Sequence, residues 1–180
     1  MARHVALLRG INVGGKNKLP MADLNALCAA VGCTEVSTYI QSGNVVFSAS
    51  ARLASGIADK IAQAIAKKLG LNVPVVIRSA AEMVAVTRNN PYLTPGANPD
   101  KLYVVFLADP PSAASVASLD AKRSPPDTFV VRGQEIYLCL PNGAGRSKLT
   151  NAYFDAKLRT VSTARNWRTV LQLAKLAVLN

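Results

Sequence analysis

Two glycine-rich segments carry the residues with the clearest capacity for chemistry. The first, GGKNKLP, covers residues 14–20, and the second, GAGRSKLT, covers residues 143–150. In both, glycine is followed by a basic residue, one intervening residue and Lys-Leu, just before a predicted helix. Glycine lets the backbone approach a ligand, basic side chains supply charge, and a helix N-terminus adds a partial positive field. We interpret the pair as cradles for an anion, against the alternative of two ordinary strand-to-helix loops.

The first segment also comes close to the phosphate-binding loop of nucleotide hydrolases. Residues 10–17, GINVGGKN, fit G-x-x-x-x-G-K, but asparagine stands where a hydroxyl would hold Mg²⁺. Because Pro20 disfavours helical geometry at Leu19, we expect the next helix to begin too late to meet a phosphate held by Lys16. Asp109 ends an apolar strand and could bind the Mg²⁺, but such strings are common. Nucleotide hydrolysis is therefore disfavoured.

The segment ARNW, residues 164–167, joins a guanidinium, a side-chain amide and the only tryptophan just before the last predicted helix. Asn166 can cap that helix while Trp167 packs in the core. An exposed Trp167 beside Arg165 would instead stack a nucleobase. We favour the core position for Trp167 and keep the other two residues as candidates.

Polar residues also flank the predicted hairpin turn Ser42-Gly43, and we expect Gln41 and Asn44 to serve mainly that turn. Asn44 is nevertheless kept as a candidate, together with residues in and around the two glycine-rich segments. The predicted anion-binding residues are Arg9, Asn12, Gly14, Gly15, Lys16, Lys18, Asn44, Arg146, Ser147, Lys148, Asn151, Arg165 and Asn166.

Several enzyme classes lack the residues they require. The only histidine, His4, falls in the first predicted strand, so no Ser-His-Asp or Cys-His arrangement forms around a loop histidine. Cys28, Cys33 and Cys139 have neither CxxC spacing nor a histidine cluster, and we expect reduced structural thiols. Carboxylates are absent from both glycine-rich segments. We predict no metal site and no cofactor.

Charge is the strongest anomaly of composition. The chain has 21 Lys and Arg against 10 Asp and Glu, a net charge of +11. Residues 1–90 carry 10 basic and 4 acidic residues, and residues 91–180 carry 11 and 6, so neither half is a basic tail. The charge makes a polyanion such as a nucleic acid the expected partner, and a phosphorylated small molecule is the other possible partner. The alternative is a solvated basic surface.

The apolar patterning predicts an α+β protein with two successive βαββαβ units. The first unit has predicted strands at 4–9, 35–41, 44–49 and 73–79, and helices at 20–32 and 53–70. The second has predicted strands at 101–108, 128–133, 134–141 and 160–164, and helices at 112–123, 149–158 and 166–178.

This order predicts a duplicated ferredoxin-like sandwich. A direct hairpin makes the second and third strands of each unit antiparallel, and right-handed crossovers put both helices on one face. We predict a first subdomain over residues 1–79, a linker with a short helix over 80–100, and a second subdomain with a C-terminal helix over 101–180. Three prolines and a glycine in PYLTPGANPD mark the linker.

No apolar run approaches the roughly 20 residues of a membrane span. The N-terminal MARHVALLRG also lacks the apolar stretch and cleavage site of a signal peptide. We therefore expect a cytoplasmic protein without a membrane partner, and leave its oligomeric state open.

Four motifs in this order, LLRGINVGGKNKLPM (7–21), TYIQSGNVVF (38–47), GRSKLTN (145–151) and ARNWRTV (164–170), resemble a bacterial family that is labelled a domain of unknown function. The resemblance covers nearly the whole chain. It implies a tandem ferredoxin-like architecture and leaves the activity unassigned.

Our leading hypothesis is a non-catalytic module that binds a phosphate-bearing ligand or nucleic acid through the basic glycine-rich loops. Only 6% of residues are aromatic, so we do not predict the RNA-recognition mode that uses aromatics on an open sheet face. The alternative is an enzyme on a small phosphorylated substrate, with Lys16 or Lys148 stabilising charge and Tyr39 or Cys139 transferring a proton or group. A third possibility is a scaffold or homo-oligomer.

Overall fold

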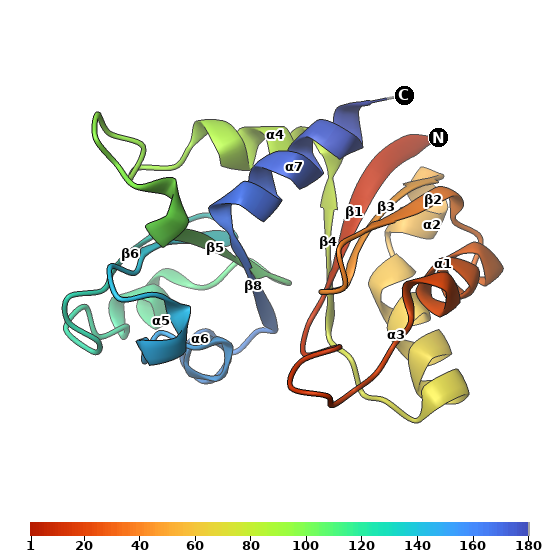
Figure 1. Cartoon of the computed structure of the whole chain (residues 1–180), viewed down its shortest axis with the longest axis horizontal. Coiled ribbons are helices and arrows are strands. Elements are labelled where there is room, and N and C mark those ends of the chain that lie inside the picture. The colour runs from red at the N-terminus through yellow and green to blue at the C-terminus, as the bar shows by residue number, and fades with distance from the viewer. Residues whose placement is uncertain (180) are drawn as a thin grey trace. The chain divides into compact units, whose positions relative to one another are not determined.

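The chain folds into two compact units, and each is built on its own four-stranded sheet (Figure 1). The computed structural model describes residues 1–179. The first unit comprises Met1–Ala85 and the described part of the segment from Gln172 onward, and the second comprises Val86–Leu171.

The first unit contains β1 (Ala2–Leu8), α1 (Met21–Ala30), β2 (Thr34–Tyr39), β3 (Asn44–Ala49), α2 (Ala51–Ala54), α3 (Ile57–Leu69) and β4 (Val75–Ser79). Its strand order is β2-β3-β1-β4, and every neighbouring pair is antiparallel. Helix α4 (Ala80–Arg88) follows β4 and continues into the second unit.

The second unit contains β5 (Leu102–Leu107), α5 (Ala113–Ala117), β6 (Thr128–Arg132), β7 (Glu135–Cys139), α6 (Asn151–Leu158) and β8 (Ser162–Asn166), followed by α7 (Trp167–Val178). Two short 3₁₀ helices, Pro99–Lys101 and Ala144–Arg146, precede β5 and α6. Its strand order, β6-β7-β5-β8, repeats that of the first unit, again fully antiparallel. The predicted α+β class and duplicated ferredoxin-like sandwich are confirmed.

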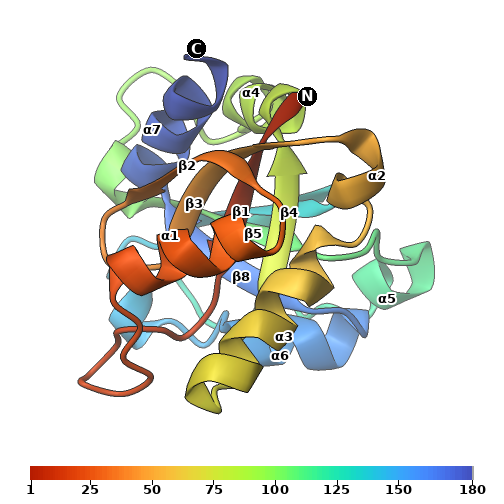
Figure 2. The same ribbon diagram turned by 90° about the vertical axis from the view of Figure 1, so that its right-hand side faces the viewer.

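Each sheet buries one face under its own helices. Figure 2 shows α1 and α3 lying across the sheet of the first unit. Helix α3 carries Ile57, Ile61 and Ile65, which are fully buried. Because they are four residues apart, they form one stripe against the strands. Burying one such side chain contributes about 1.5–3 kcal/mol. In the second unit, Phe154 and Leu158 of α6 play the same part.

Two predicted elements differ at their boundaries because of backbone conformation. The helix predicted over 53–70 is divided into α2 and α3 by Gly56, which lacks the helical propensity to continue the first helix. The strand predicted over 35–41 ends at Tyr39, because Ile40 takes a φ of +49°. The hairpin loop is therefore the four residues 40–43, not the predicted two-residue turn, and Tyr39 pairs with Asn44.

The helix predicted over 112–123 is shorter than expected. Ser112 caps α5 by accepting a hydrogen bond from the Ser115 amide, but the helix ends at Ala117. Beyond it, the Asp120 side chain accepts from the Lys122 amide in a local turn, which offers this segment an alternative to helix.

The sheet faces opposite α1 and α3 in the first unit, and opposite α6 in the second, carry one buried arginine each. Arg78 is the fourth residue of β4 and pairs with Val5, and Arg165 is the fourth residue of β8 and pairs with Val104. Both are almost fully buried. The matching positions extend the duplication to single residues, although the sequence alone drew attention only to Arg165.

Candidate functional site

The two glycine-rich loops occupy different places in the repeated topology. The first connects β1 to α1, the first crossover of its unit, whereas the second connects β7 to α6, the second crossover of its unit. Their similar sequences therefore do not mark corresponding points of the duplication. Each loop is described within its own unit.

The first loop folds back on itself as a small hairpin. Val13 and Lys16 form a β-bridge, with the Lys16 amide donating to the Val13 carbonyl at 3.0 Å. Gly14 and Gly15 make the turn between them with φ values of +57° and +74°. Only glycine adopts two such successive conformations readily, which explains the pair. The Lys16 and Lys18 side chains are exposed.

Hydrogen bonds from asparagine side chains to backbone groups hold this hairpin closed. Asn12 donates to the carbonyls of Leu19 at 2.9 Å and Gln41 at 2.8 Å, and its Oδ1 accepts from the Leu19 amide at 2.8 Å. Asn17 donates to the Gly10 carbonyl at 2.9 Å. The Asn12 side chain thus satisfies backbone groups of its own loop and ties it to the hairpin turn between β2 and β3.

Asn44 and Gly43 belong to the same structural arrangement. Asn44 is fully buried and donates to the Tyr39 carbonyl at 3.1 Å and the Ser42 hydroxyl at 2.9 Å. Gly43 lies so close to β1 and the first loop that an added Cβ would stand 2.7 Å from Leu8 Cβ and 2.9 Å from Ile11 Cδ1. The Asn44 side chain therefore serves its own hairpin turn.

The first loop does not have the conformation of a phosphate-binding loop. The amides of Asn12, Lys16 and Leu19 donate to acceptors within the loop, so they do not converge on a ligand. Helix α1 begins at Met21 without a side-chain cap, and this confirms the predicted late start. Arg9, the remaining candidate of this unit, is half-buried and its amide donates to the Pro74 carbonyl.

The second loop is anchored at its centre. The Lys148 amide donates to the Ser124 hydroxyl at 3.0 Å, and the Lys148 carbonyl accepts from Arg123 Nε at 2.9 Å. Arg123 also lies over the Tyr153 ring of α6, 4.0 Å from its centre. These contacts fix the backbone of Lys148, while its side chain and that of Arg146 are exposed. Thr150 caps α6 as the sequence suggested.

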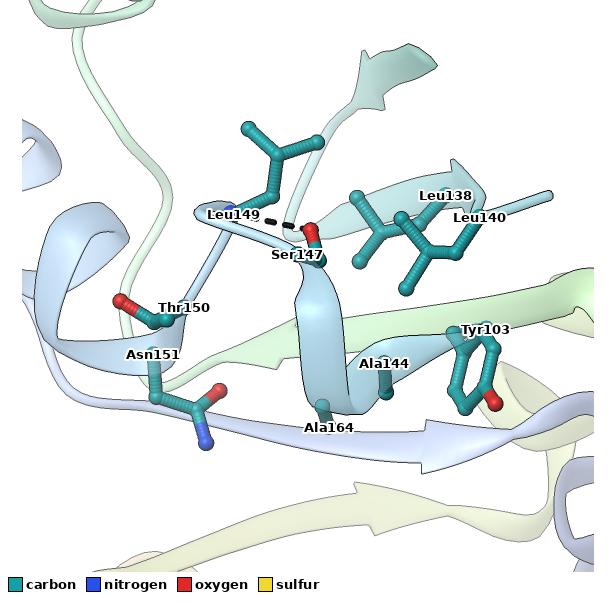
Figure 3. Close-up of a pocket in the computed structure, with 9 residues that line it drawn as sticks. All are labelled: Tyr103, Leu138, Leu140, Ala144, Ser147, Leu149, Thr150, Asn151 and Ala164. Carbon is teal, nitrogen blue, oxygen red and sulfur yellow. Dashed lines mark hydrogen bonds between the residues drawn. The ribbon is translucent and has the colours of Figure 1, made fainter. Parts of the chain in front are cut away.

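A pocket of about 250 Å³ lies beside this loop (Figure 3). It is lined by Tyr103, Leu138, Leu140, Ala144, Ser147, Leu149, Thr150, Asn151 and Ala164. In Figure 3 the Tyr103 ring and two leucines occupy one end, and Thr150 and Asn151 occupy the other. The pocket therefore has an apolar end on the sheet and a polar end at the start of α6.

The two hydroxyl groups at the pocket each accept a hydrogen bond from a backbone amide of their own segment. The Ser147 hydroxyl accepts from the Leu149 amide at 3.0 Å, and the Thr150 hydroxyl accepts from the Tyr153 amide at 3.2 Å. Each hydroxyl has a hydrogen of its own to donate. The nine lining residues include no carboxylate, histidine or cysteine. This lining, next to two cations, suits a ligand that carries negative charge.

The remaining candidates lie around β8. Arg165 projects from the face opposite Ala164, which lines the pocket, and donates to Thr163 Oγ1 and the Ala164 carbonyl, both at 2.8 Å. Burial lowers the pKa of Arg165 to about 10. Asn166 accepts from the Thr169 amide at 2.9 Å and so caps α7. Trp167 is 2% exposed, which confirms the predicted core position and removes the base-stacking alternative.

The structure thus gathers Arg146, Ser147, Lys148 and Asn151 at one loop and pocket. In the other unit it gathers Arg9, Asn12, Gly14, Gly15, Lys16, Lys18 and Asn44 at the first loop and the adjoining hairpin turn. Tyr103, Arg123 and Ser124 were missed by sequence reasoning. No local signal marks them, because they reach the second loop only through tertiary contacts.

The thiols proposed for structural roles are buried or half-buried. Burial, with Cys33 a second cause, raises the pKa of Cys28 to about 12. Burial and, secondarily, the Asp127 charge raise the pKa of Cys139. A raised pKa keeps a thiol protonated and weakens it as a nucleophile. Neither Cys139 nor Tyr39 lines the pocket beside the second loop.

Within residues 1–179, no cluster of three His, Cys, Asp or Glu side chains is arranged to hold a metal ion. Over the same residues, no helix has the length and apolar character needed to cross a membrane.

The repeated β-α-β-β-α-β order and antiparallel sheets place the chain among tandem ferredoxin-like proteins. The model of a family described as "Protein of unknown function (DUF1697)" matches residues 1–137, well over half of the chain. The chain belongs to this family, and the expected resemblance to a bacterial family of unknown function is confirmed. The match ends before the second glycine-rich loop.

The fold is similar to that of conserved bacterial protein SP0830 from Streptococcus pneumoniae. The two share 23% sequence identity with a TM-score of 0.72, over 98% of each chain. At this identity the similarity concerns the fold. No curated protein matches the sequence.

Proposed function

We propose that this protein is a non-catalytic module that binds a phosphate-bearing ligand at the second glycine-rich loop. Arg146 and Lys148 would attract the phosphate, and the adjoining pocket would take an apolar ring of the same ligand. The observation that carries the proposal is the position of this doubly basic loop at the edge of a pocket with an apolar floor.

The size of the pocket supports a small ring. Sites for drug-sized molecules enclose about 300–1,000 Å³, and this pocket measures about 250 Å³. A nucleobase fits these dimensions, with the Tyr103 ring and Leu140 available for apolar contact. The Ser147 hydroxyl and the Asn151 amide supply hydrogen-bond donors near the loop. The ligand class favoured by this combination is a nucleotide, free or within a nucleic acid.

The anchoring of the loop also supports binding. Because Ser124 and Arg123 hold both backbone groups of Lys148, the loop pays little ordering entropy when a ligand arrives. In the first loop, by contrast, the amide side chains of Asn12 and Asn17 are engaged in closing the loop.

The test is isothermal titration of the protein with AMP and with ribose 5-phosphate, which has the phosphate but no base. We expect AMP to bind more tightly, because only AMP fills the pocket. Ala144 is exposed and lines the pocket, so Ala144→Phe should fill it and abolish the advantage of AMP. Ala156→Phe, at an exposed position of α6 outside the pocket, is the matched control.

Equal affinity for both ligands would remove the pocket from the proposal. If neither AMP nor ribose 5-phosphate binds at low salt and millimolar concentration, the proposal as a whole is refuted.

A further inference from the structure

A second pocket lies in the same unit, at the same end of the sheet. Its volume is about 240 Å³. It is lined by Tyr92, Thr94, Ala97, Asn98, Lys101, Leu102, Cys139 and Pro141. Tyr92 and Lys101 belong to the segment that leads into β5, and Cys139 ends β7.

The two pockets lie on opposite faces of the sheet, beside the same two strands, β5 and β7. Leu138 and Leu140 line the first pocket, whereas Cys139 and Pro141 line the second. Successive residues of a strand point to opposite faces of the sheet, so this alternation places the pockets on opposite faces. The strand end between them is fixed by the Leu140 amide, which donates to the Lys101 carbonyl at 2.8 Å.

The two pockets are also chemically alike. Each holds one half-exposed tyrosine, Tyr103 in the first and Tyr92 in the second, beside aliphatic side chains. Neither lining contains a carboxylate. Cations stand at both: Lys101 lines the second pocket, and Arg146 and Lys148 belong to the loop that borders the first.

The turn from Leu140 to Gly143 separates the two pockets and is open to a ligand. The Gly143 amide donates to the Leu140 carbonyl at 2.9 Å, and Pro141 and Asn142 are exposed. A ligand that passes over this turn would enter both pockets. A single nucleotide has one ring and fills only one of them.

We propose that the ligand is a single-stranded oligonucleotide whose neighbouring bases enter the two pockets as its backbone crosses the Leu140–Gly143 turn. This inference rests on the proposed function and specifies its ligand. Two aromatic side chains next to lysines are the usual means by which single strands are held, through base stacking and phosphate attraction. The bases would lie at the end of the strands and not on the open sheet face.

The first test is a length series of 5′-phosphorylated oligoadenylates, from the mononucleotide to the hexamer, measured by titration at fixed salt. Filling a second stacking site should raise affinity at least about fivefold between the mononucleotide and the first oligomer that spans both pockets. If the mononucleotide binds but no oligomer binds more tightly, this inference is wrong and the proposed function stands. If neither binds, both are wrong.

Cys139 provides a reporter inside the second pocket. Its thiol is half-buried, whereas Cys28 and Cys33 are buried in the other unit, so iodoacetamide should modify Cys139 first. An oligonucleotide should slow this modification several-fold, as measured by mass spectrometry of the Cys139 peptide. AMP at a concentration that fills the first pocket, where Arg146 and Lys148 would hold its phosphate, should slow the modification less than the oligonucleotide does, because the second pocket offers only Lys101 to a phosphate. Equal protection by AMP would show that the second pocket is not a separate subsite.

Substitution of Tyr92 separates stacking from general charge attraction. Tyr92→Ala should abolish the gain from chain length while leaving AMP affinity unchanged, and Tyr92→Phe, which keeps the ring, should retain the gain. A polyglutamate peptide of equal charge should not protect Cys139. Protection by that peptide would overturn the assignment of the ligand as a nucleic acid.

Discussion

The two glycine-rich loops have similar sequences and different structures. Both contain glycines followed by basic-x-Lys-Leu and a helix. The first closes on itself, because the amide side chains of Asn12 and Asn17 bond to backbone groups of the loop. The second has no such amide closure and is instead fixed from outside by Arg123 and Ser124.

This difference shows that loop composition does not determine loop chemistry. Asparagine can replace missing backbone partners in a turn, since it both donates and accepts. A serine hydroxyl satisfies one amide and still has its hydrogen to offer, as Ser147 does beside the pocket. The side chains of the first loop are thus used within the loop, whereas the second loop keeps hydroxyl hydrogens for the ligand that we propose.

The largest expected effect concerns the hairpin turn on which the first loop rests. Gly43→Ala should lower the free energy of unfolding by about 3 kcal/mol, since φ is +80° and the new Cβ would overlap Leu8 and Ile11. Gly14→Ala, with φ of +57° and open space around it, should cost only about 1 kcal/mol. Urea denaturation measures both. Equal losses would mean that the close packing does not matter.

The next effect concerns the amide closure. Asn12→Gly tolerates the φ of +54° but removes three hydrogen bonds and leaves the amide of fully buried Leu19 without its acceptor. We expect a loss of about 2 kcal/mol in unfolding free energy. Ser147→Ala, which removes one comparable bond from the second loop, should cost about 1 kcal/mol. A larger loss for Ser147→Ala would reverse the assigned roles of the loops.

A third effect separates the loops by ligand binding. The double variant Arg146→Ala/Lys148→Ala should bind single-stranded RNA more weakly. Its slope of log affinity against log salt should be shallower by about 1.4, the contribution of two phosphate contacts. Lys16→Ala/Lys18→Ala removes equal charge from the first loop and should leave the slope nearly unchanged. Anisotropy titrations over a salt series give both slopes, and identical changes would assign binding to net charge alone.

The smallest effect concerns the helices that follow the loops. Thr150 caps α6 with a side-chain hydrogen bond, whereas α1 begins after Pro20 without one. Thr150→Ala should lower the free energy of unfolding by about 1 kcal/mol, and Thr150→Ser should recover most of it. Thermal denaturation is a suitable measurement. An unchanged midpoint for Thr150→Ala would mean that tertiary packing alone holds the start of α6.

Much of the fold could be predicted because its signals are local. The spacing of Ile57, Ile61 and Ile65 specifies the buried face of a helix, and the direct connection of β2 to β3 fixes their antiparallel pairing. One boundary that failed depends on a single backbone conformation. The left-handed geometry of Ile40 ended β2 early, and a β-branched residue gives no warning of such a φ.

The candidate site was predictable in part. Residue types alone drew attention to Arg146, Ser147, Lys148 and Asn151, which lie together at the second loop. The same reasoning also selected Asn44. Its side chain is fully buried and bonds within its own hairpin turn, which residue type alone does not reveal.

The sequence by itself determined the repeated element order, the positive charge and the basic character of both loops, because these depend on residue type and short-range periodicity. Only the tertiary structure showed that the second loop borders a pocket. That outcome depends on Tyr103 and Ala164, which β5 and β8 bring to the face of the sheet beside the loop, and on Ser124 and Arg123, which hold Lys148 in place. Contacts between residues more than 20 positions apart leave no pattern in a single sequence, since any surface serine or arginine would look the same.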